Sequence, residues 1–369
     1  MVEVVIGGTK SARQGFSFEE VAIAPQRRTR DASEVSTSWN IDAYKFDTPF
    51  IAAPMDSVVS PDSAVTISRN GALAVLNLEG LWGRYEDPTI FLREIAQVDP
   101  DRATELLQKL YAEKPVDAGL IKNRIAQLKE SGITVSVAVS PQRTAELAPI
   151  AASSGADILV IRGTTVSAEH VAASGEPLNL KSFIYDLDIP AIVGGCATAQ
   201  AALHLMRTGA AGVLVGFGGG SAHTTAEVLG VRVPMATAIA DVASARRDYL
   251  DESGGRYVHV IADGSMGNSG DIVKAFACGA DAAMVGSVLS RGTDSPGGGT
   301  HWGSEAWHQT LPRGERQPMK QVGTLDQILN GPATTGDGTM NLVGALRKAM
   351  ATTGYSDLKE FQRVEMIVS

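Results

Sequence analysis

The sequence is poor in cysteine, with only Cys196 and Cys278 among 369 residues. Two cysteines cannot build a disulfide framework, and both lie in apolar stretches, so we expect a reducing, cytoplasmic environment. No run of about 18 apolar residues is present, so we expect no membrane-spanning helix and no membrane partner. The first residues lack a basic segment followed by an apolar core, and no secretory signal is therefore expected.

An excess of positive charge is also missing. The formal net charge is −9 and the isoelectric point is about 5.2. This acidity argues against nucleic acid as a partner, although backbone amides and helix N-termini can still bind a phosphate locally. Apolar residues, in contrast, make up 44% of the chain, which is enough for one large core. The length fits two average domains or one (β/α) barrel with insertions.

Four segments repeat the same local pattern, a Gly-Ala pair followed by a short apolar run. They begin at Asn70, Ser154, Thr208 and Cys278. A glycine in this position ends a helix and leads into a buried strand. The repetition predicts αβ units arranged around a parallel sheet.

Eight apolar runs have the length of a strand. They cover Pro49–Met55, Leu73–Leu78, Val135–Val139, Ile158–Ile161, Ala191–Val193, Val213–Val215, Val258–Ala262 and Ala282–Val285. Helical patterns lie between most of them, for example at Pro61–Arg69, Ala199–Arg207, Met235–Leu250 and Asp271–Cys278. Eight strands with intervening helices favour an α/β fold of the closed (β/α)8 type, a TIM barrel, as one domain over residues 1–369. An open doubly wound sheet is the alternative.

Two stretches depart from the regular alternation. Residues 80–130 are polar and helical in pattern, which predicts a short insertion after the second strand. Residues 296–341 are rich in glycine and proline and show no helix or strand pattern, which is typical of a flap over an active site. A solvent-exposed excursion without a function is the alternative for the second stretch.

A glycine-rich loop follows the sixth predicted strand. It contains Gly216, Gly218, Gly219, Gly220, Ser221, Thr224 and Thr225. Glycines expose backbone N–H groups and allow a ligand to approach closely, so the loop suits an anion or a flat heterocycle. A mobile surface turn is the alternative.

The loops after the seventh and eighth strands have the composition of a phosphate site. Asp263-Gly264 follows the seventh strand and precedes a helix, and Gly286-Ser287 follows the eighth. These two loops of a barrel commonly bind phosphate through backbone amides and a helix N-terminus. The Asp263 carboxylate would then suit a ribose diol, because it can accept two hydroxyl hydrogen bonds. A helix N-cap at Ser269 or Asp271 with no ligand is the alternative.

The glycine-rich loop resembles the catalytic loop of the IMP dehydrogenase/GMP reductase family, whose pattern is Gly-x-Gly-x-Gly-Ser-x-Cys-Thr-Thr. The matching residues are Gly216, Gly218, Gly220, Ser221, Thr224 and Thr225. Where the family has its nucleophilic cysteine, this chain has His223. The resemblance implies a TIM barrel, and about fifty inserted residues are too few for the family's regulatory CBS domains.

The resemblance also implies a ligand. It places a purine nucleoside monophosphate on Gly220, Ser221, Asp263, Gly264, Gly286 and Ser287, with Met55 packed against the base. Without the resemblance, Met55 would be assigned to the core. Ser265 stands where the family usually has a second glycine, and its side chain could crowd the phosphate.

The resemblance further implies NAD or NADP as cofactor, with contacts at Gly216, Gly218 and Arg162. The family has an aspartate at the position of Arg162, so this arginine either binds an extra phosphate, as on NADP, or blocks the site. No Arg-Tyr pair for activating water is recognisable in residues 296–341. Glu315, with Thr225 of the loop, is a candidate acid or base, whereas His301 and His308 are expected to be solvated lid residues.

Family chemistry requires a thiolate that attacks purine C2. A His223 adduct would carry a positive charge at a site built for an anionic nucleophile, so direct replacement is disfavoured, although His223 remains a candidate. Cys196 is expected at the same barrel face and is the candidate for a relocated thiol, with a small buried hydrophobe as the alternative.

These features predict a purine-nucleotide oxidoreductase of guanine metabolism, with weak or no activity if the thiol is lost. One alternative is a non-catalytic protein that senses the nucleotide or joins an active paralogue. Another is an FMN-dependent oxidoreductase, because the same loops suit flavin phosphate. The resemblance implies a homotetramer or a larger homo-oligomer.

Overall fold

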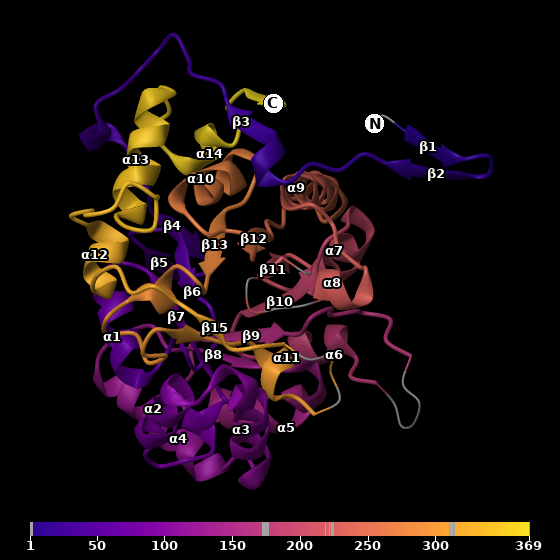
Figure 1. Ribbon diagram of the computed structural model, residues 1–369. Coiled ribbons are helices and arrows are strands. Elements are labelled where there is room, and N and C mark those ends of the chain that lie inside the picture. The colour runs from indigo at the N-terminus through magenta and orange to yellow at the C-terminus, as the bar shows by residue number, and fades with distance from the viewer. Residues whose placement is uncertain are drawn as a thin grey trace.

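The computed structural model describes residues 3–171, 177–217, 219–220, 222, 225–309, 311 and 314–368, with Thr225 described by its backbone alone. In this part of the chain, eight parallel strands close into a barrel, and each pairs with the next along the chain until the last returns to the first (Figure 1). The strands are β6 (Phe50–Ala52), β7 (Leu73–Asn77), β8 (Ser136–Val139), β9 (Ile158–Arg162), β10 (Ala191–Cys196), β11 (Gly212–Val215), β12 (His259–Asp263) and β13 (Ala282–Val285). The predicted TIM barrel is confirmed.

A helix follows each barrel strand and covers the outside of the sheet. These helices are α1 (Pro61–Arg69), α4 (Ala118–Glu130), α5 (Thr144–Ser153), α6 (Leu180–Tyr185), α7 (Ala199–Met206), α9 (Met235–Glu252), α10 (Ser269–Ala277) and α13 (Leu342–Thr352). The first shows how the sequence sets such a boundary: Ser60 caps it, Pro61 occupies its first turn, and Gly71 beyond its end has a φ of +77°. Because helices cover one face and barrel side chains fill the other, the strands are almost wholly apolar.

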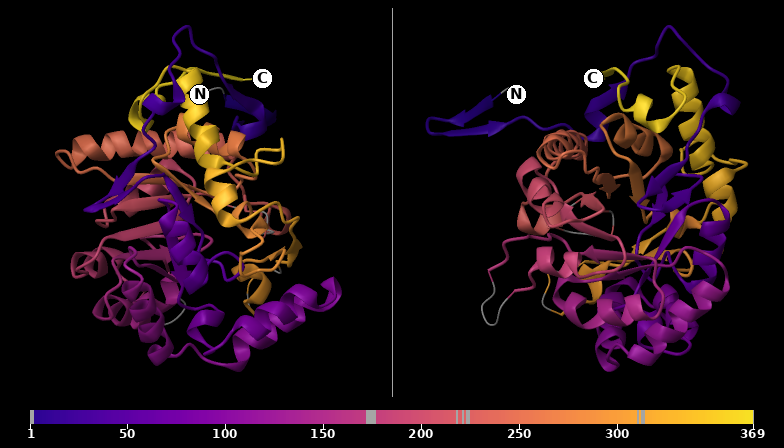
Figure 2. Two further views of the ribbon diagram at one scale, coloured as in Figure 1. Left: turned by 90° about the vertical axis from the view of Figure 1, so that its left-hand side faces the viewer. Right: turned by 180° about the vertical axis from the view of Figure 1, so that it is seen from behind.

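Further elements surround the barrel. The antiparallel hairpin of β1 (Glu3–Gly7) and β2 (Lys10–Arg13) extends away from the body (Figures 1 and 2). The others are β3 (Val21–Ile23), β4 (Trp39–Ile41), β5 (Tyr44–Phe46), α8 (Thr225–Leu229), α14 (Leu358–Phe361) and β16 (Met366–Val368). β16 pairs with β3, so the C-terminal strand lies against a segment near the N-terminus.

The stretch at 296–341 contains more regular structure than its sequence suggests. It includes β14 (Thr300–His301), α11 (Ser304–Trp307), β15 (Gln317–Pro318) and α12 (Leu325–Asn330). The expectation of a segment without helix or strand is therefore wrong. The physical reason is that single apolar side chains anchor it, because Trp302 is 1% exposed and Leu325 is fully buried.

The predicted insertion supports this flap. Its two helices are α2 (Thr89–Gln97) and α3 (Pro100–Glu113), and α3 packs against α11 of the flap. Residues 118–130, which were assigned to the insertion, instead form the barrel helix α4, because its apolar side chains are buried in the barrel core. Tyr111 of α3 stacks on Trp307 of the flap, with ring centroids 4.6 Å apart. Arg316 of the flap donates from Nη1 to the carbonyl of Ile95 in α2 at 2.6 Å. The insertion and the flap are thus fastened to each other.

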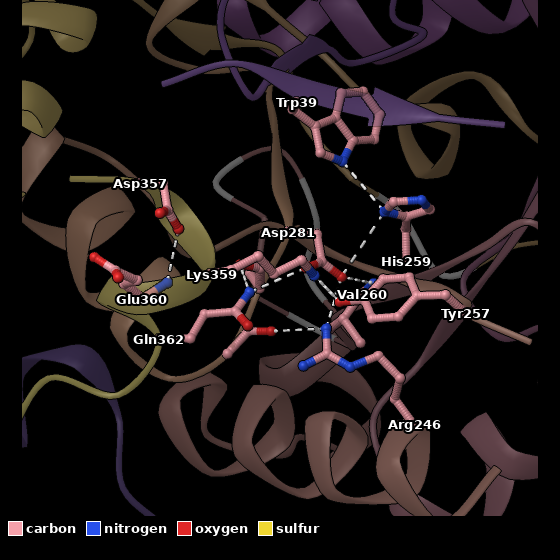
Figure 3. A network of polar contacts seen from close by, with 12 residues as sticks. Trp39, Arg246, Tyr257, His259, Val260, Asp281, Asp357, Lys359, Glu360 and Gln362 are labelled. Carbon is pink, nitrogen blue, oxygen red and sulfur yellow. Dashed lines mark hydrogen bonds and ion pairs between the residues drawn. The ribbon is translucent and has the colours of Figure 1, made fainter. Parts of the chain in front are cut away.

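At the opposite end of the barrel, where the strands begin, one carboxylate is the centre of a network of polar contacts (Figure 3). Asp281, immediately before β13, is 2% exposed. It accepts hydrogen bonds from Arg246 Nη1 (2.7 Å), Val260 N (2.8 Å), Tyr257 Oη (2.8 Å), Lys359 Nζ (2.6 Å) and Gln362 Nε2 (3.0 Å). Arg246 lies in α9, Val260 in β12 and Lys359 in α14, while the other two donors lie just before β12 and just after α14. Asp281 therefore joins the C-terminal segment to the barrel.

Throughout the described ranges, no helix combines the length and the apolar character needed to cross a bilayer.

Candidate active site

A cavity of about 350 Å³ opens at the mouth of the barrel, the end at which the parallel strands finish. It is lined by residues at the ends of β9, β12 and β13, by the segments that follow β6, β11, β12 and β13, and by Ser17–Glu19 near the N-terminus. Those among them that were predicted to bind substrate are Met55, Gly220, Asp263, Gly264, Gly286 and Ser287. The structure therefore brings together all of the predicted substrate residues that it describes, since Ser221 lies outside the described part.

The segment after β13 presents backbone donors to the cavity. Within the described chain, the N–H groups of Gly286 and Ser287 have no hydrogen-bond acceptor. A Cβ added at Gly286 would lie 3.2 Å from Met55 Sδ and 3.3 Å from His301 Cε1. Glycine at this position keeps the amides accessible and lets those two side chains approach each other. The arrangement is suited to binding an anion.

The helix α10 contributes less to this site than its position suggests. The Ser269 N–H donates to the Gly338 carbonyl at 2.7 Å, and the Asp271 N–H donates to Oδ1 of the N-cap residue Asn268 at 3.0 Å. Asp271 also lines the cavity, and burial raises the pKa of its carboxyl. The expectation that a helix N-terminus receives the phosphate is therefore not supported. The N-cap of α10 is Asn268, and not Ser269 or Asp271, which were named as the alternatives.

Ser265 was expected to crowd the phosphate, but its side chain is hydrogen-bonded to a neighbouring loop. It has a φ of +58°, a backbone conformation that glycine adopts more readily. Its Oγ and its N–H both donate to the carbonyl of Gly219, at 2.9 and 2.8 Å. The serine hydroxyl is thereby committed to the loop after β11, which it fastens to the loop after β12.

Arg162 forms an ion pair across the mouth. Its Nε donates to Oδ2 of Asp263 at 2.9 Å, and its Nη2 lies 3.5 Å from Oδ1. The two side chains are 19% and 14% exposed. Gly216 contacts the same residue, because a Cβ there would lie 1.9 Å from the Asp263 carbonyl oxygen. Three residues were expected to contact a dinucleotide. Two of them, Arg162 and Gly216, contact Asp263 instead, and the third, Gly218, lies outside the described residues.

The expectation of a relocated thiol at Cys196 is not supported. Cys196 is 2% exposed, donates from Sγ to the Leu214 carbonyl at 3.4 Å, and does not line the cavity. Burial raises its pKa to about 12, so the thiol stays protonated at neutral pH. Burial likewise raises the pKa of Cys278 to about 12. Because these are the two cysteines of the chain, the cavity contains no thiol.

Of the remaining catalytic candidates, Glu315 alone has a described side chain. Glu315 is exposed, accepts a hydrogen bond from Gln317 Nε2, and does not line the cavity. Thr225 begins α8, but its side chain is outside the description. His223 also lies outside the described residues, so its role stays a prediction.

His301 is a cavity residue that the sequence assigned wrongly. It was expected in a solvated lid, but it is 2% exposed and lines the cavity beside Met55. Its Nδ1 lies 2.9 Å from Ser57 Oγ. The neighbouring Trp302, which anchors the flap in the core, was the available sequence signal that this segment is buried.

Asp56, which follows the cavity residue Met55 in the chain, was also missed. It is 2% exposed, and its Oδ2 accepts hydrogen bonds from the Leu81 N–H at 2.8 Å and from the Tyr111 hydroxyl. That hydroxyl accepts from Trp302 Nε1 at 3.1 Å, so the network joins barrel, insertion and flap. Burial raises the pKa of Asp56 to about 6, although the two hydrogen bonds oppose the change.

No group of His, Cys, Asp and Glu side chains in the described ranges is arranged to hold a metal ion.

Comparison with known proteins identifies the family. A sequence profile of the IMP dehydrogenase / GMP reductase domain matches residues 15–369. The chain belongs to the IMP dehydrogenase/GMP reductase family. This confirms the family inferred from the glycine-rich loop, and it makes the chain a member of a family of oxidoreductases.

Members of the family resemble this chain to different degrees. Proteins of Mycolicibacterium smegmatis and Mycobacterium leprae, named only as oxidoreductases, are each 50% identical over the full length of both chains. An inosine-5′-monophosphate dehydrogenase of Thermoplasma acidophilum is 28% identical over 77% of this chain and 74% of its own. The crystal structure of an IMP dehydrogenase/GMP reductase-like protein from Corynebacterium glutamicum is 48% identical, with a TM-score of 0.94 over 100% of this chain and 98% of that one.

Proposed function

We propose that this family member binds a purine nucleoside monophosphate, IMP or GMP, in the mouth cavity and acts in guanine nucleotide metabolism. The observation that carries the proposal is the convergence of Met55, Asp263 and the Gly286–Ser287 amides on one cavity. A thioether beside a flat base, a carboxylate beside a sugar and free amides beside a phosphate match the three parts of such a nucleotide.

The described residues suggest how the ligand would lie. The phosphate would accept hydrogen bonds from the Gly286 and Ser287 N–H groups, which lack acceptors within the described chain. The base would pack on Met55, near His301. Asp263 would face the ribose from the end of β12, with Arg162 already on its carboxylate.

An oxidoreductase reaction in this cavity would have to proceed without a thiolate. Neither cysteine reaches the cavity, and both have pKa values of about 12. We therefore expect turnover with NAD or NADP to be slow or absent. The same observation favours a second candidate function, a nucleotide-binding protein that senses the ligand or joins an active paralogue without turnover.

Calorimetry with IMP and with GMP tests the proposal directly. Binding is expected, and nucleotide at 100 times its Kd should stabilise the fold by about 2.7 kcal/mol. Gly286→Val should weaken binding, because its side chain would enter the space between Met55 and His301. Gly8→Val is the matched control, since a Cβ at Gly8 meets nothing within 4 Å. Absence of binding by both nucleotides would contradict the proposal.

Nicotinamide absorbance separates the two candidate functions. An enzyme gives IMP-dependent formation of NADH or NADPH, or GMP-dependent loss of it. Nucleotide binding without either change identifies a binder. A yellow protein with flavin absorbance would favour FMN instead. Sedimentation measures the assembly, for which we propose a homotetramer or a larger homo-oligomer.

A further inference from the structure

The ion pair between Arg162 and Asp263 spans the barrel mouth. Arg162 is the last residue of β9 and Asp263 the last of β12, with the ends of β10 and β11 between them. The intervening strands contribute Gly195 and Gly216 near their ends. The arginine can therefore cross to the aspartate without passing a side chain at either position. Both members of the pair line the cavity.

The pair changes what the Asp263 carboxylate can do for a ligand. A free carboxylate is a strong acceptor for the hydroxyls of a ribose, and a sugar lacking one hydroxyl would leave part of that charge unsatisfied. Here the guanidinium supplies charge-assisted hydrogen bonds in advance. The charge of the Asp263 carboxylate is therefore compensated, and some of its acceptor positions are occupied, before a ribose hydroxyl binds.

The pair should persist when a nucleotide binds. Both side chains are largely buried, so a neutral hydroxyl that displaced the arginine would leave two opposite charges without their partner. The nucleotide phosphate would lie on the Gly286–Ser287 side, next to β13, whereas Arg162 comes from β9 on the far side of β12. The phosphate is therefore poorly placed to draw the guanidinium away from Asp263.

We propose that Arg162 is a specificity-determining residue that removes discrimination at the sugar. The cavity would accept 2′-deoxy purine nucleoside monophosphates about as well as ribonucleotides. This inference rests on the proposed nucleotide-binding function and specifies the substrate class of the same site.

The test is a calorimetric comparison of IMP and 2′-deoxy-IMP on the full-length protein. The wild type should bind the two with affinities within about threefold of each other. Arg162→Met removes the guanidinium but keeps an unbranched apolar stem, and it should widen the ratio to more than about tenfold in favour of IMP. Arg232→Met is the matched control, because Arg232 lines the same cavity without a hydrogen bond to Asp263. It should leave the ratio as in the wild type.

The outcomes distinguish this inference from the function on which it rests. Wild-type binding of IMP with more than tenfold rejection of the deoxynucleotide would overturn the inference and leave the proposed function standing. An equal ratio in the wild type and in Arg162→Met would also overturn it. Failure of both nucleotides to bind the wild type would overturn the proposed function, and the inference with it. The wild-type ratio needs no variant, so a poorly folded Arg162→Met still leaves the inference falsifiable.

Discussion

Asp56 and Asp281 are equally buried, at 2% exposure, yet their carboxyl groups behave in opposite ways. Burial raises the pKa of Asp56 to about 6. Burial also opposes ionisation of Asp281, but the charges of Arg246 and Lys359 outweigh it, and the pKa falls to about 2. Burial alone therefore does not determine the charge of an aspartate. The cations and donors around it do.

The two carboxylates also lie at opposite ends of the barrel. Asp281 is at the end where strands begin, among five donors, and it holds the C-terminal segment in place. Asp56 is beside the mouth, and in the described chain its Oδ1 has no hydrogen-bond partner. In TIM barrels the first end serves stability and the second serves function. The less satisfied carboxylate is thus found beside the candidate active site.

The largest expected effect is that of Asp281→Asn. The amide keeps the shape but leaves Arg246, which is 8% exposed, without its counter-charge. Loss of one partner from a buried pair should reduce the free energy of unfolding by about 3–5 kcal/mol in urea denaturation. Glu252→Gln is the control, because it breaks the exposed pair with Arg207 and should cost much less. Equal losses would show that burial of the Asp281 network contributes nothing special.

The next effect is the pH dependence that His259 causes in the Asp281 network. Burial lowers the pKa of His259 to about 4 in the folded state, against 6.5 ordinarily, although Asp281 opposes the change. Between these values the unfolded chain binds the proton first, so stability is lost as the pH falls from 6.5 to 4. The loss reaches up to about 3 kcal/mol. His259→Asn should remove this contribution in unfolding measured across that range, and the exposed His170→Asn should not.

A smaller effect of opposite sign is expected at Asp56. Its folded pKa is raised, so its protonation stabilises the fold below pH 3.8, and that contribution is lost as the pH rises through about 6. Asp56→Asn should therefore raise the free energy of unfolding by about 1–3 kcal/mol at pH 8 and by little at pH 3.5. The comparison is chemical denaturation at the two pH values, with the exposed Asp248→Asn as control. Destabilisation at pH 8 would show that the Asp56 charge is needed by its donors.

The elements of the barrel were predictable because their signals are local. The Gly-Ala pairs at helix ends and the apolar runs after them identified the strands, and the helical pattern at Pro61–Arg69 matches α1. The flap was assigned less well, because its short strands and helices have too few residues for a periodic pattern. Single buried side chains such as Trp302 fix it instead.

The residues of the candidate site were predictable by type but not by partner. Gly264, Gly286 and Ser287 are at loop positions that barrels use for phosphate, and all three line the cavity. The partner of Arg162 is 101 residues away in the chain, and His301 contacts Ser57 across 244 residues. No local pattern reports contacts of this kind, so Arg162 was expected on a dinucleotide and His301 in solvent.

By itself the sequence determined the barrel, the family and the absence of a thiol at the nucleophile position, since each follows from the types of residues that lie close together in the chain. Only the tertiary structure decided that Cys196 is buried away from the cavity, that Arg162 neutralises Asp263 and that two equally buried aspartates differ in pKa. The physical reason is that pKa values and ion pairs depend on which distant groups the fold brings within a few ångströms.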